Sequence, residues 1–444
     1  MTPARSNSTL ILLGLAATIA AAGAGARSAL AQVAVSTTAR TTSAVPSTPD
    51  PADAAMRFLE DRVRRDPDDA GAHNKLAVRY LQRLRETGSL DYLDLALRAA
   101  RASLASVPMT RNIGGLAALA QAEFASHEFA AARDHALELT KLDPGRGYPY
   151  GLLGDALLEL GDYDGAASVL ETMARVEGRL TVGGETRHAH LALLRGDVPG
   201  AQRHYSHALA LARDLPEPPR ETVAWCQWQL GETAFSSGDY EAAERQYREA
   251  LATFPDYVRA LASLGRARAA RGDLAEGIEL YERAVRRYPD PTFVAALGDL
   301  YKLTGRDRDA IAQYALVETI GHLSATSGAL YNRQLASFYA DHGFKAEEAY
   351  AGAAREYAVR PDIYGADALA WTALKANRLD EARAAIRDAL RLGTQDARLF
   401  YHAGMIARAA GDEPASREHM KRALALNPQF DPLQASMLRA SLGE

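Results

Sequence analysis

The sequence predicts an all-α protein, a solenoid of about ten stacked helix-turn-helix repeats. The first observation is a 34-residue period, because the segment 230–255 is followed by a similar segment at 264–289. The second is the composition: aromatic residues make up only 7 % of the chain, and the frequent alanine, leucine, arginine and glutamate residues favour helices over strands. The third is a regular spacing of small residues and prolines, which fits helix pairs that pack closely and end at a proline.

Each position that repeats has a structural role. Small residues let two antiparallel helices approach closely, while leucine and tyrosine fill the volume between neighbouring pairs. Gly238 and Asp239 predict the turn inside one pair, since glycine accepts a positive φ and aspartate caps the next helix. The residues that stand 34 apart are Leu230 and Leu264, Gly231 and Gly265, Tyr247 and Tyr281, Ala250 and Ala284, and Pro255 and Pro289.

The same register extends over most of the chain. The small residues that mark the first helices are Ala120, Gly154, Ala189, Gly231, Gly265, Gly298, Ala336, Ala370 and Gly404, and an earlier helix around 76–80 pairs with 93–103. The two longest spacings coincide with insertions at 214–219 and 320–329. We therefore predict an N-terminal array of about four repeats at 52–213, a C-terminal array of about six repeats at 220–429 and a capping helix at 430–444. Contacts are expected between nearest neighbours only, so the N-terminal array should fold alone.

The first residues are typical of a secretory signal peptide. Arg5 supplies the positive charge, 10–22 is an uncharged apolar run, and Ala29 and Ala31 form an A-x-A cleavage site before Gln32. We predict a signal peptide at 1–31 and an exported protein, periplasmic or secreted after cleavage near Ala31 and Gln32, with no membrane span left. An uncleaved anchor is the alternative. Residues 32–51 contain few bulky apolar groups and are expected to be a disordered leader.

Composition excludes several classes of function. The formal net charge of −5 is mild for 444 residues and the basic residues are scattered, so neither nucleic acid nor an anionic membrane is an expected partner. Cys226 is the only cysteine, which excludes an intramolecular disulfide framework and a cysteine-ligated metal cluster. No nucleophile elbow and no phosphate-binding glycine motif follows a predicted strand. We therefore expect a non-enzymatic protein without a cofactor.

The chain past about residue 70 resembles the tetratricopeptide-repeat (TPR) superfamily, on the period, small residues and prolines above. The segments 358–371 and 392–407 also resemble exported bacterial repeat proteins of this superfamily. The resemblance implies a right-handed superhelical solenoid that binds peptides or proteins on its concave side. It implies no reaction and names no partner.

A partner-binding groove follows from this resemblance, because the first helix of each pair would line the concave side. All three tryptophans of the chain fall on such positions, and aromatic and arginine side chains are typical of interaction hot spots. Alternatively, Trp225 and Trp228 only cover the junction after 214–219. The predicted groove residues are Trp225, Trp228, Glu232, Phe235, Arg259, Arg266, Arg333, Tyr364, Asp367, Trp371, Arg398, Tyr401 and Arg408, and the same count adds Tyr148, Asp155, His190, Asp299 and Lys302.

Three hypotheses on function remain. The first is a scaffold or adaptor in the cell envelope that holds an extended peptide or a partner protein in the groove. The second is a structural protein that assembles with copies of itself. The third is a metal-binding protein, since His188, His190, His204 and His207 are the densest histidine group. Against a metal stands the expectation that His190 faces the groove while His207 points elsewhere, and we predict no metal ligand.

Overall fold

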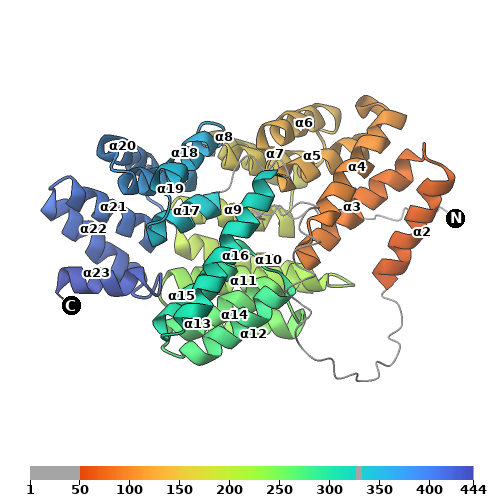
Figure 1. The fold of residues 1–444 in the computed structure, drawn as a ribbon. Helices are drawn as coiled ribbons and strands as arrows, with labels where there is room; N and C mark the ends of the chain where they lie inside the picture. The colour runs from red at the N-terminus through yellow and green to blue at the C-terminus, as the bar shows by residue number, and fades with distance from the viewer. Residues whose placement is uncertain (1–50, 327–332, 444) are drawn as a thin grey trace, which may run out of the picture.

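The computed structural model describes residues 51–326 and 333–443, and their regular secondary structure is helical throughout (Figure 1). The helices are α2 (Pro51–Arg65), α3 (Ala70–Thr87), α4 (Asp91–Ser106), the 3-10 helix η2 (Met109–Arg111), α5 (Ile113–Ala125), α6 (Phe129–Leu142), α7 (Gly147–Glu159), α8 (Tyr163–Glu177), α9 (Val182–Leu194), α10 (Val198–Arg213), α11 (Arg220–Ser236), α12 (Tyr240–Thr253), α13 (Val258–Ala270), α14 (Leu274–Arg287), α15 (Pro291–Leu303), α16 (Asp307–Thr326), α17 (Arg333–His342), α18 (Ala346–Tyr357), α19 (Ile363–Lys375), α20 (Leu379–Ala389), α21 (Ala397–Ala409), α22 (Glu413–Leu426) and α23 (Gln434–Leu442). The predicted signal peptide and the leader up to residue 50 lie outside the described residues.

The helices from α3 to α22 pair into ten antiparallel hairpins, α3 with α4 through to α21 with α22, and neighbouring hairpins pack side by side. The predicted all-α solenoid is thus confirmed. Helix α2 precedes the first hairpin, and α23 follows the last. None of the described helices combines the length and the apolar character that crossing a membrane requires. The division into arrays of four and six repeats stays a prediction.

The turn inside each hairpin forms for the local reasons that the sequence indicates. At the fifth hairpin Gly238 has a φ of 75°, a conformation that costs residues with a Cβ about 1–2 kcal/mol. The Asp239 carboxylate then accepts a hydrogen bond from the Ala242 N–H at 3.0 Å and caps α12. Equivalent caps are made by Asp162, Asp197, Asp273 and Asp412.

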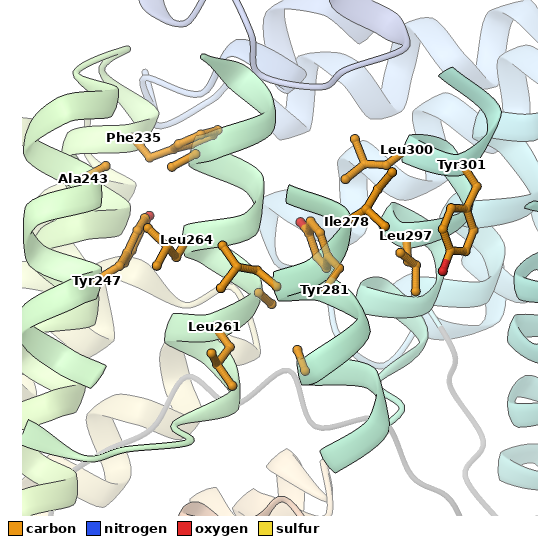
Figure 2. Close-up of a cluster of buried hydrophobic side chains, with 14 of the residues drawn as sticks. Phe235, Ala243, Tyr247, Leu261, Leu264, Ile278, Tyr281, Leu297, Leu300 and Tyr301 are labelled. Atoms are coloured by element: carbon orange, nitrogen blue, oxygen red, sulfur yellow. The ribbon is translucent and has the colours of Figure 1, made fainter. Parts of the chain in front are cut away.

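The core lies between the helices of each hairpin and between neighbouring hairpins. Figure 2 shows one such cluster, in which Phe235, Tyr247 and Leu264 join the fifth and sixth hairpins and Tyr281 continues toward Leu297 of the seventh. Gly231 lets α11 and α12 approach closely, because a Cβ on this residue would collide with the Tyr247 ring. Each fully buried leucine or tyrosine of this kind stabilises the fold by about 1.5–3 kcal/mol.

The solenoid also closes on itself. The Ile363 N–H donates a hydrogen bond to the Tyr163 hydroxyl at 2.8 Å, and the Asn427 amide donates to the Phe235 carbonyl at 2.9 Å. These contacts place α8 beside the start of α19, and the turn after α11 beside the end of α22 (Figure 1). The expectation of nearest-neighbour contacts only is therefore wrong, because the superhelix brings residues about 200 positions apart together.

Two of the closing contacts require glycine for two reasons, the lack of space for a Cβ and a positive φ angle. A Cβ on Gly161 would collide with the Pro361 carbonyl oxygen, and a Cβ on Gly196 would lie 2.5 Å from the Gly393 carbonyl oxygen. Both glycines also have positive φ angles of 75° and 76°. The Thr394 hydroxyl next to Gly393 donates to the Leu194 carbonyl in the same contact. The turns inside the third and fourth hairpins thus pack directly against the chain around the ninth hairpin.

The C-terminal segment lies across the concave side of the last hairpins as well as over their end. The Gln434 amide at the start of α23 donates to Asp341 on α17 at 2.6 Å. Leu438 on α23 and Phe430 before it pack into the cluster that contains Trp371 and Tyr401. Of the two insertions, 214–219 connects α10 to α11, and α16 extends through Thr326 into 320–329, whose last residues lie outside the described part.

Candidate functional site

A cavity of about 470 Å³ lies between the first helices α13, α15 and α17 and the C-terminal segment 429–432. This volume is within the range of about 300–1,000 Å³ that is typical of ligand pockets. The residues from α13 and α15 are mostly apolar, including Ala262, Ala269, Ala270, Phe293, Ala296 and Leu303. Those from α17, α21 and the segment 429–432 are mostly polar, including Arg333, Gln334, Ser337, Asp341, Arg398 and Asp431.

The cavity exists because small residues line one wall and the returning C-terminal segment closes the other. Alanines at inner positions of α13 and α15 leave space where larger side chains would fill the concave side. The Tyr240 hydroxyl and Asn427 Oδ1 lie 2.6 Å apart, and Tyr240 also accepts from the Gln429 N–H at 3.0 Å. These bonds fix the segment opposite α13 and α15, so the solenoid's closure builds the site.

Arg266 is held in place before any ligand binds. Its Nη2 donates to the two carboxylate oxygens of Glu232 at 2.8 and 2.7 Å, and its guanidinium stacks over the Phe235 ring at 4.0 Å. Burial alone would raise the pKa of Glu232, but Arg266 and the hydroxyl groups of Tyr247 and Ser263 hold it below its usual value. The pair therefore stays charged at neutral pH.

Arg333 and Arg398 differ in how firmly they are held. Arg333 donates to Asp362 at 3.2 and 2.6 Å and forms an ion pair with Glu356 at 2.9 Å, with only 15 % of its side chain exposed. Among the described residues Arg398 makes one ion pair, at 3.4 Å to Asp431, and 43 % of its side chain is exposed. Arg398 is thus the least committed of the three cavity arginines, with donors left to bind another group.

The acidic side chains of the cavity are held in the same way. Asp341 accepts from the Trp371 indole N–H at 2.8 Å and from the Gln434 amide. Asp431 accepts from two backbone N–H groups at the start of α23, and burial raises its pKa against the opposing effect of Arg398. Asp299 accepts from the Tyr314 hydroxyl at 2.8 Å. Charges of both signs are thus fixed around one cavity.

The structure brings four of the predicted groove residues into this cavity: Arg266, Arg333, Arg398 and Asp299. Trp228 and Arg259 line a separate cavity of about 110 Å³ together with residues of the first hairpin. There the Trp228 indole donates to the Ser263 hydroxyl at 2.9 Å, and the Arg259 guanidinium lies 5.3 Å from the ring. These six predicted groove residues thus line one or the other of the two cavities.

For other groove residues the expectation of a ligand-facing side chain is wrong. Trp225 and Phe235 are 5 % and 4 % exposed, and Trp371 and Tyr401 are each 2 % exposed. Trp225 packs into the core against Tyr205. Trp371 stacks on His402 with ring centroids 4.2 Å apart, and Tyr401 lies beside Phe430 at 5.4 Å. Asp367 is buried as well and bonds to His402 at 2.8 Å. These three side chains are therefore used in packing within the chain. Tyr364 and Arg408 are exposed but do not line the large cavity.

Sequence reasoning missed Asp341, His342, Phe430 and Asp431, which all line the cavity. Ser337 directly follows the marker residue Ala336, so the repeat register could have placed it on the inner face of α17. Asp341 is further along the helix and falls outside the positions that the register assigns to the groove. Phe430 and Asp431 gave no signal, because the segment after Pro428 was expected to cover only the end of the array.

The histidine group is divided in the structure. His188 and His204 stack with ring centroids 5.6 Å apart, and His207 lies beside His204 at 6.5 Å. His190 lies apart from them, where it lines a small cavity with Asp155 and Arg187. The alternative hypothesis that all four histidines form a single metal site is therefore wrong, although three of them, His188, His204 and His207, lie together.

The repeats match known families over most of the described hairpins. Two family models, each described as tetratricopeptide repeat, match residues 184–256 for one and 117–176, 229–292, 269–320 and 368–429 for the other, together more than half of the chain. Comparison with curated proteins finds no match.

Three solved structures are similar in part. PilW, a type IV pilus biogenesis factor, shares 16 % identity over 47 % of this chain and 92 % of its own, with a TM-score of 0.40. TTC0263, a TPR protein of Thermus thermophilus, shares 22 % identity over 44 % and 98 %, with a TM-score of 0.38. The human IFIT1 dimer shares 12 % identity over 86 % and 96 %, with a TM-score of 0.42. On its repeats, its hairpins and the family models, the chain belongs to the tetratricopeptide-repeat superfamily, whose arrays are scaffolds for protein–protein interaction.

Proposed function

We propose that this protein is a non-enzymatic adaptor of the cell envelope that holds an extended segment of another polypeptide in the cavity between α13, α15, α17 and residues 429–432. The observation that carries the proposal is the composition of the cavity, with a mostly apolar wall facing a wall of fixed charges. An extended peptide has both kinds of group, since its side chains alternate in direction and its backbone N–H and C=O groups need partners.

The fixed charges favour binding over catalysis. Arg266, Arg333 and Asp341 each already hold two or more intramolecular bonds, so a ligand would meet donors and acceptors whose ordering cost has been met in folding. Arg398, with one long ion pair, is the group that we assign to the peptide backbone or to an acidic side chain. The apolar wall would accept one or two apolar side chains, each adding about 1.5–3 kcal/mol of burial.

A peptide selection on the purified mature chain tests this proposal. Peptides from a random display library are selected on the parent protein and then measured on two tryptophan variants. Ser337→Trp fills the cavity from α17, whereas Ala312→Trp places the same side chain on the exposed face of α16. We expect selected peptides to lose at least about tenfold in affinity, or about 1.4 kcal/mol, on Ser337→Trp and to bind Ala312→Trp like the parent. Equal binding to all three proteins would place the contact outside the cavity and refute the proposal.

The envelope location has its own test. The motivation is the apolar run at 10–22 followed by Ala29 and Ala31. Intact mass of the protein recovered from fractionated producing cells should show a chain that starts at Gln32 in the envelope or secreted fraction. Recovery of full-length protein from the cytosolic fraction alone would contradict export without affecting the proposal on peptide binding.

A further inference from the structure

A second cluster of side chains lies in the fourth hairpin, away from the cavity described above. Glu185 on α9 faces His204 and His207 on α10. One oxygen of the Glu185 carboxylate, Oε2, lies 3.0 Å from His204 Nδ1 and 3.1 Å from His207 Nδ1. One nitrogen or oxygen of each of the three residues lies within 4.8 Å of the others. Three potential ligand atoms thus converge on one point.

The local structure fixes this convergence. His204 and His207 are three positions apart on a helix, so both project from one face of α10. His188, three positions after Glu185 on α9, stacks its ring on His204 and limits how that imidazole can turn. The Glu185 side chain is 3 % exposed, whereas those of His204 and His207 are 36 % and 56 % exposed. The carboxylate is therefore buried and rigid, and the two imidazoles leave the site open to solvent.

The charge of the buried carboxylate has little compensation from the protein. Within the residues that the structure describes, the ion pairs of Glu185 are those with His204 and His207, and no lysine or arginine pairs with it. An imidazole, unlike a guanidinium or an ammonium group, carries no permanent charge. A buried carboxylate without a full positive charge nearby is costly. A bound cation would remove that cost.

We propose that Glu185, His204 and His207 bind a divalent transition-metal ion, with Zn²⁺ as the ion that the donor set fits best. Two imidazoles and one carboxylate form a known open zinc set, which leaves a fourth position to water. Zinc bonds of about 2.0–2.2 Å in tetrahedral geometry separate neighbouring ligand atoms by roughly 3.4 Å. The two separations from Glu185 Oε2, 3.0 and 3.1 Å, need to widen by only a few tenths of an ångström, and all three ligand atoms already lie within 4.8 Å of one another. The ion would join α9 to α10 and so fasten the fourth hairpin.

Each ligand has a defined state in this site. The carboxylate binds through Oε2, and each imidazole binds through a deprotonated Nδ1 with its hydrogen on Nε2. No residue of the large cavity takes part, so the metal site and the proposed peptide site can be tested separately.

Titration of the untagged, chelator-treated mature chain with ZnCl₂ tests the proposal by calorimetry, with Co²⁺ absorption as a second readout of tetrahedral coordination. We expect one ion per chain, and losses of at least about tenfold in affinity for His207→Ala and for His204→Ala. The control is His322→Ala, because His322 on α16 is exposed and bonds to the Glu318 carbonyl of its own helix. This variant should bind like the parent.

Two further measurements keep the outcome decisive. Glu185→Gln retains a hydrogen-bonding group but removes the charge, and it should weaken Zn²⁺ binding without unfolding the hairpin. If this variant does not fold, the two histidine variants carry the test, since both side chains are at least one-third exposed. Failure of the parent to bind Zn²⁺ at 100 µM, on the order of −5.5 kcal/mol, would overturn the proposal. Equal binding by the parent and the double variant His204→Ala/His207→Ala would overturn it too.

Discussion

The imidazole of His342 on α17 donates from Nε2 to Oδ1 of Asp299 on α15 at 2.8 Å, and its Nδ1 faces the Phe338 carbonyl oxygen at the same distance. Because both ring nitrogens face acceptors, only the doubly protonated imidazole can satisfy both. Burial alone would lower the pKa of His342, but Asp299 and the Phe338 carbonyl raise it above its usual value. This charged pair links the seventh and eighth hairpins at the edge of the cavity.

The sign of the resulting pH dependence is fixed. Consider a histidine whose pKa is higher in the folded state than in the unfolded state. Its contribution to stability is fully present when the pH is below the unfolded pKa, near 6.5. The contribution is lost as the pH rises through the folded pKa. We expect His342→Gln to lower the free energy of unfolding by about 1–2 kcal/mol at pH 6 and by less at pH 9, measured by urea titration.

The control for this measurement is a histidine with the opposite shift. Burial lowers the pKa of His419 on α22, so its contribution to stability is present above the unfolded pKa and is lost as pH falls. The cost of His419→Gln should therefore shrink, not grow, from pH 8 to pH 5. Parallel pH profiles for the two variants would contradict the assignment of charge to His342.

The closing contact at Gly161 predicts a difference between two glycines with the same backbone conformation. Gly161 and Gly305 both have a φ of 75°, but a Cβ on Gly161 meets the Pro361 carbonyl while one on Gly305 meets open space. Gly305→Ala should cost about 1 kcal/mol for the positive φ alone. Gly161→Ala should cost roughly 2 kcal/mol more, since the contact is overfilled.

Urea unfolding monitored by circular dichroism measures both glycine variants. Because the clash lies at a contact between hairpins far apart in sequence, the Gly161→Ala chain should also be more susceptible to proteolysis around 361–363 than the Gly305→Ala chain. Equal losses of stability in the two variants would mean that the solenoid does not close at this point in solution.

Neighbouring residues of α23 test whether the C-terminal segment is docked. Leu438 is 1 % exposed and packs in the cluster around Trp371, whereas Met437 is 54 % exposed. Leu438→Ala should lower the free energy of unfolding by about 2–5 kcal/mol, and Met437→Ala should change it by less than about 0.5 kcal/mol. Acrylamide quenching of tryptophan emission should rise only in the Leu438 variant. If Leu438→Ala behaves like Met437→Ala, the segment is not bound across the concave side.

Two arginines of α21 separate the cavity from the rest of the predicted groove. Arg398 lines the cavity, whereas Arg408 is exposed on the same helix outside it. Peptides selected on the parent should bind Arg398→Ala about tenfold more weakly and Arg408→Ala with unchanged affinity. The affinity for Arg398→Ala should also vary less with salt, since a screened attraction has been removed. Calorimetry at two salt concentrations measures both effects, and an unchanged affinity for Arg398→Ala would exclude this arginine from the site.

The sequence was sufficient for the hairpins because their causes are local. Gly238 and Asp239 turn and cap the chain by themselves, and Gly231 opposite Tyr247 shows in one repeat how the helices approach. Placement on the first helices was also predictable, so Arg266 and Arg333 were found. Their partners Glu232 and Asp362 are 34 and 29 residues away in the sequence. Of these two partners, only Glu232 is among the predicted groove residues.

Closure of the superhelix could not be predicted in this way. Whether Gly161 meets Pro361 depends on the small rotation between neighbouring hairpins, summed over the intervening repeats. A repeat pattern states that hairpins stack but not by what angle. The summed rotation between hairpins also determines that the segment around Phe430 reaches Tyr401. The burial of Tyr401 and Trp371 therefore could not be predicted from the position of each residue along its own helix.

Repeat proteins commonly gain or lose whole units, because each unit touches only its neighbours. In this chain the segment between Gly161 and Pro361 and the segment between Gly196 and Gly393 both contain the fifth to eighth hairpins. Duplicating or deleting one hairpin within that span would rotate both contacts out of register together. The number of hairpins between these contacts is therefore constrained as strictly as the identity of a buried core residue. Repeats can be added by duplication only outside the part of the chain that the two contacts enclose.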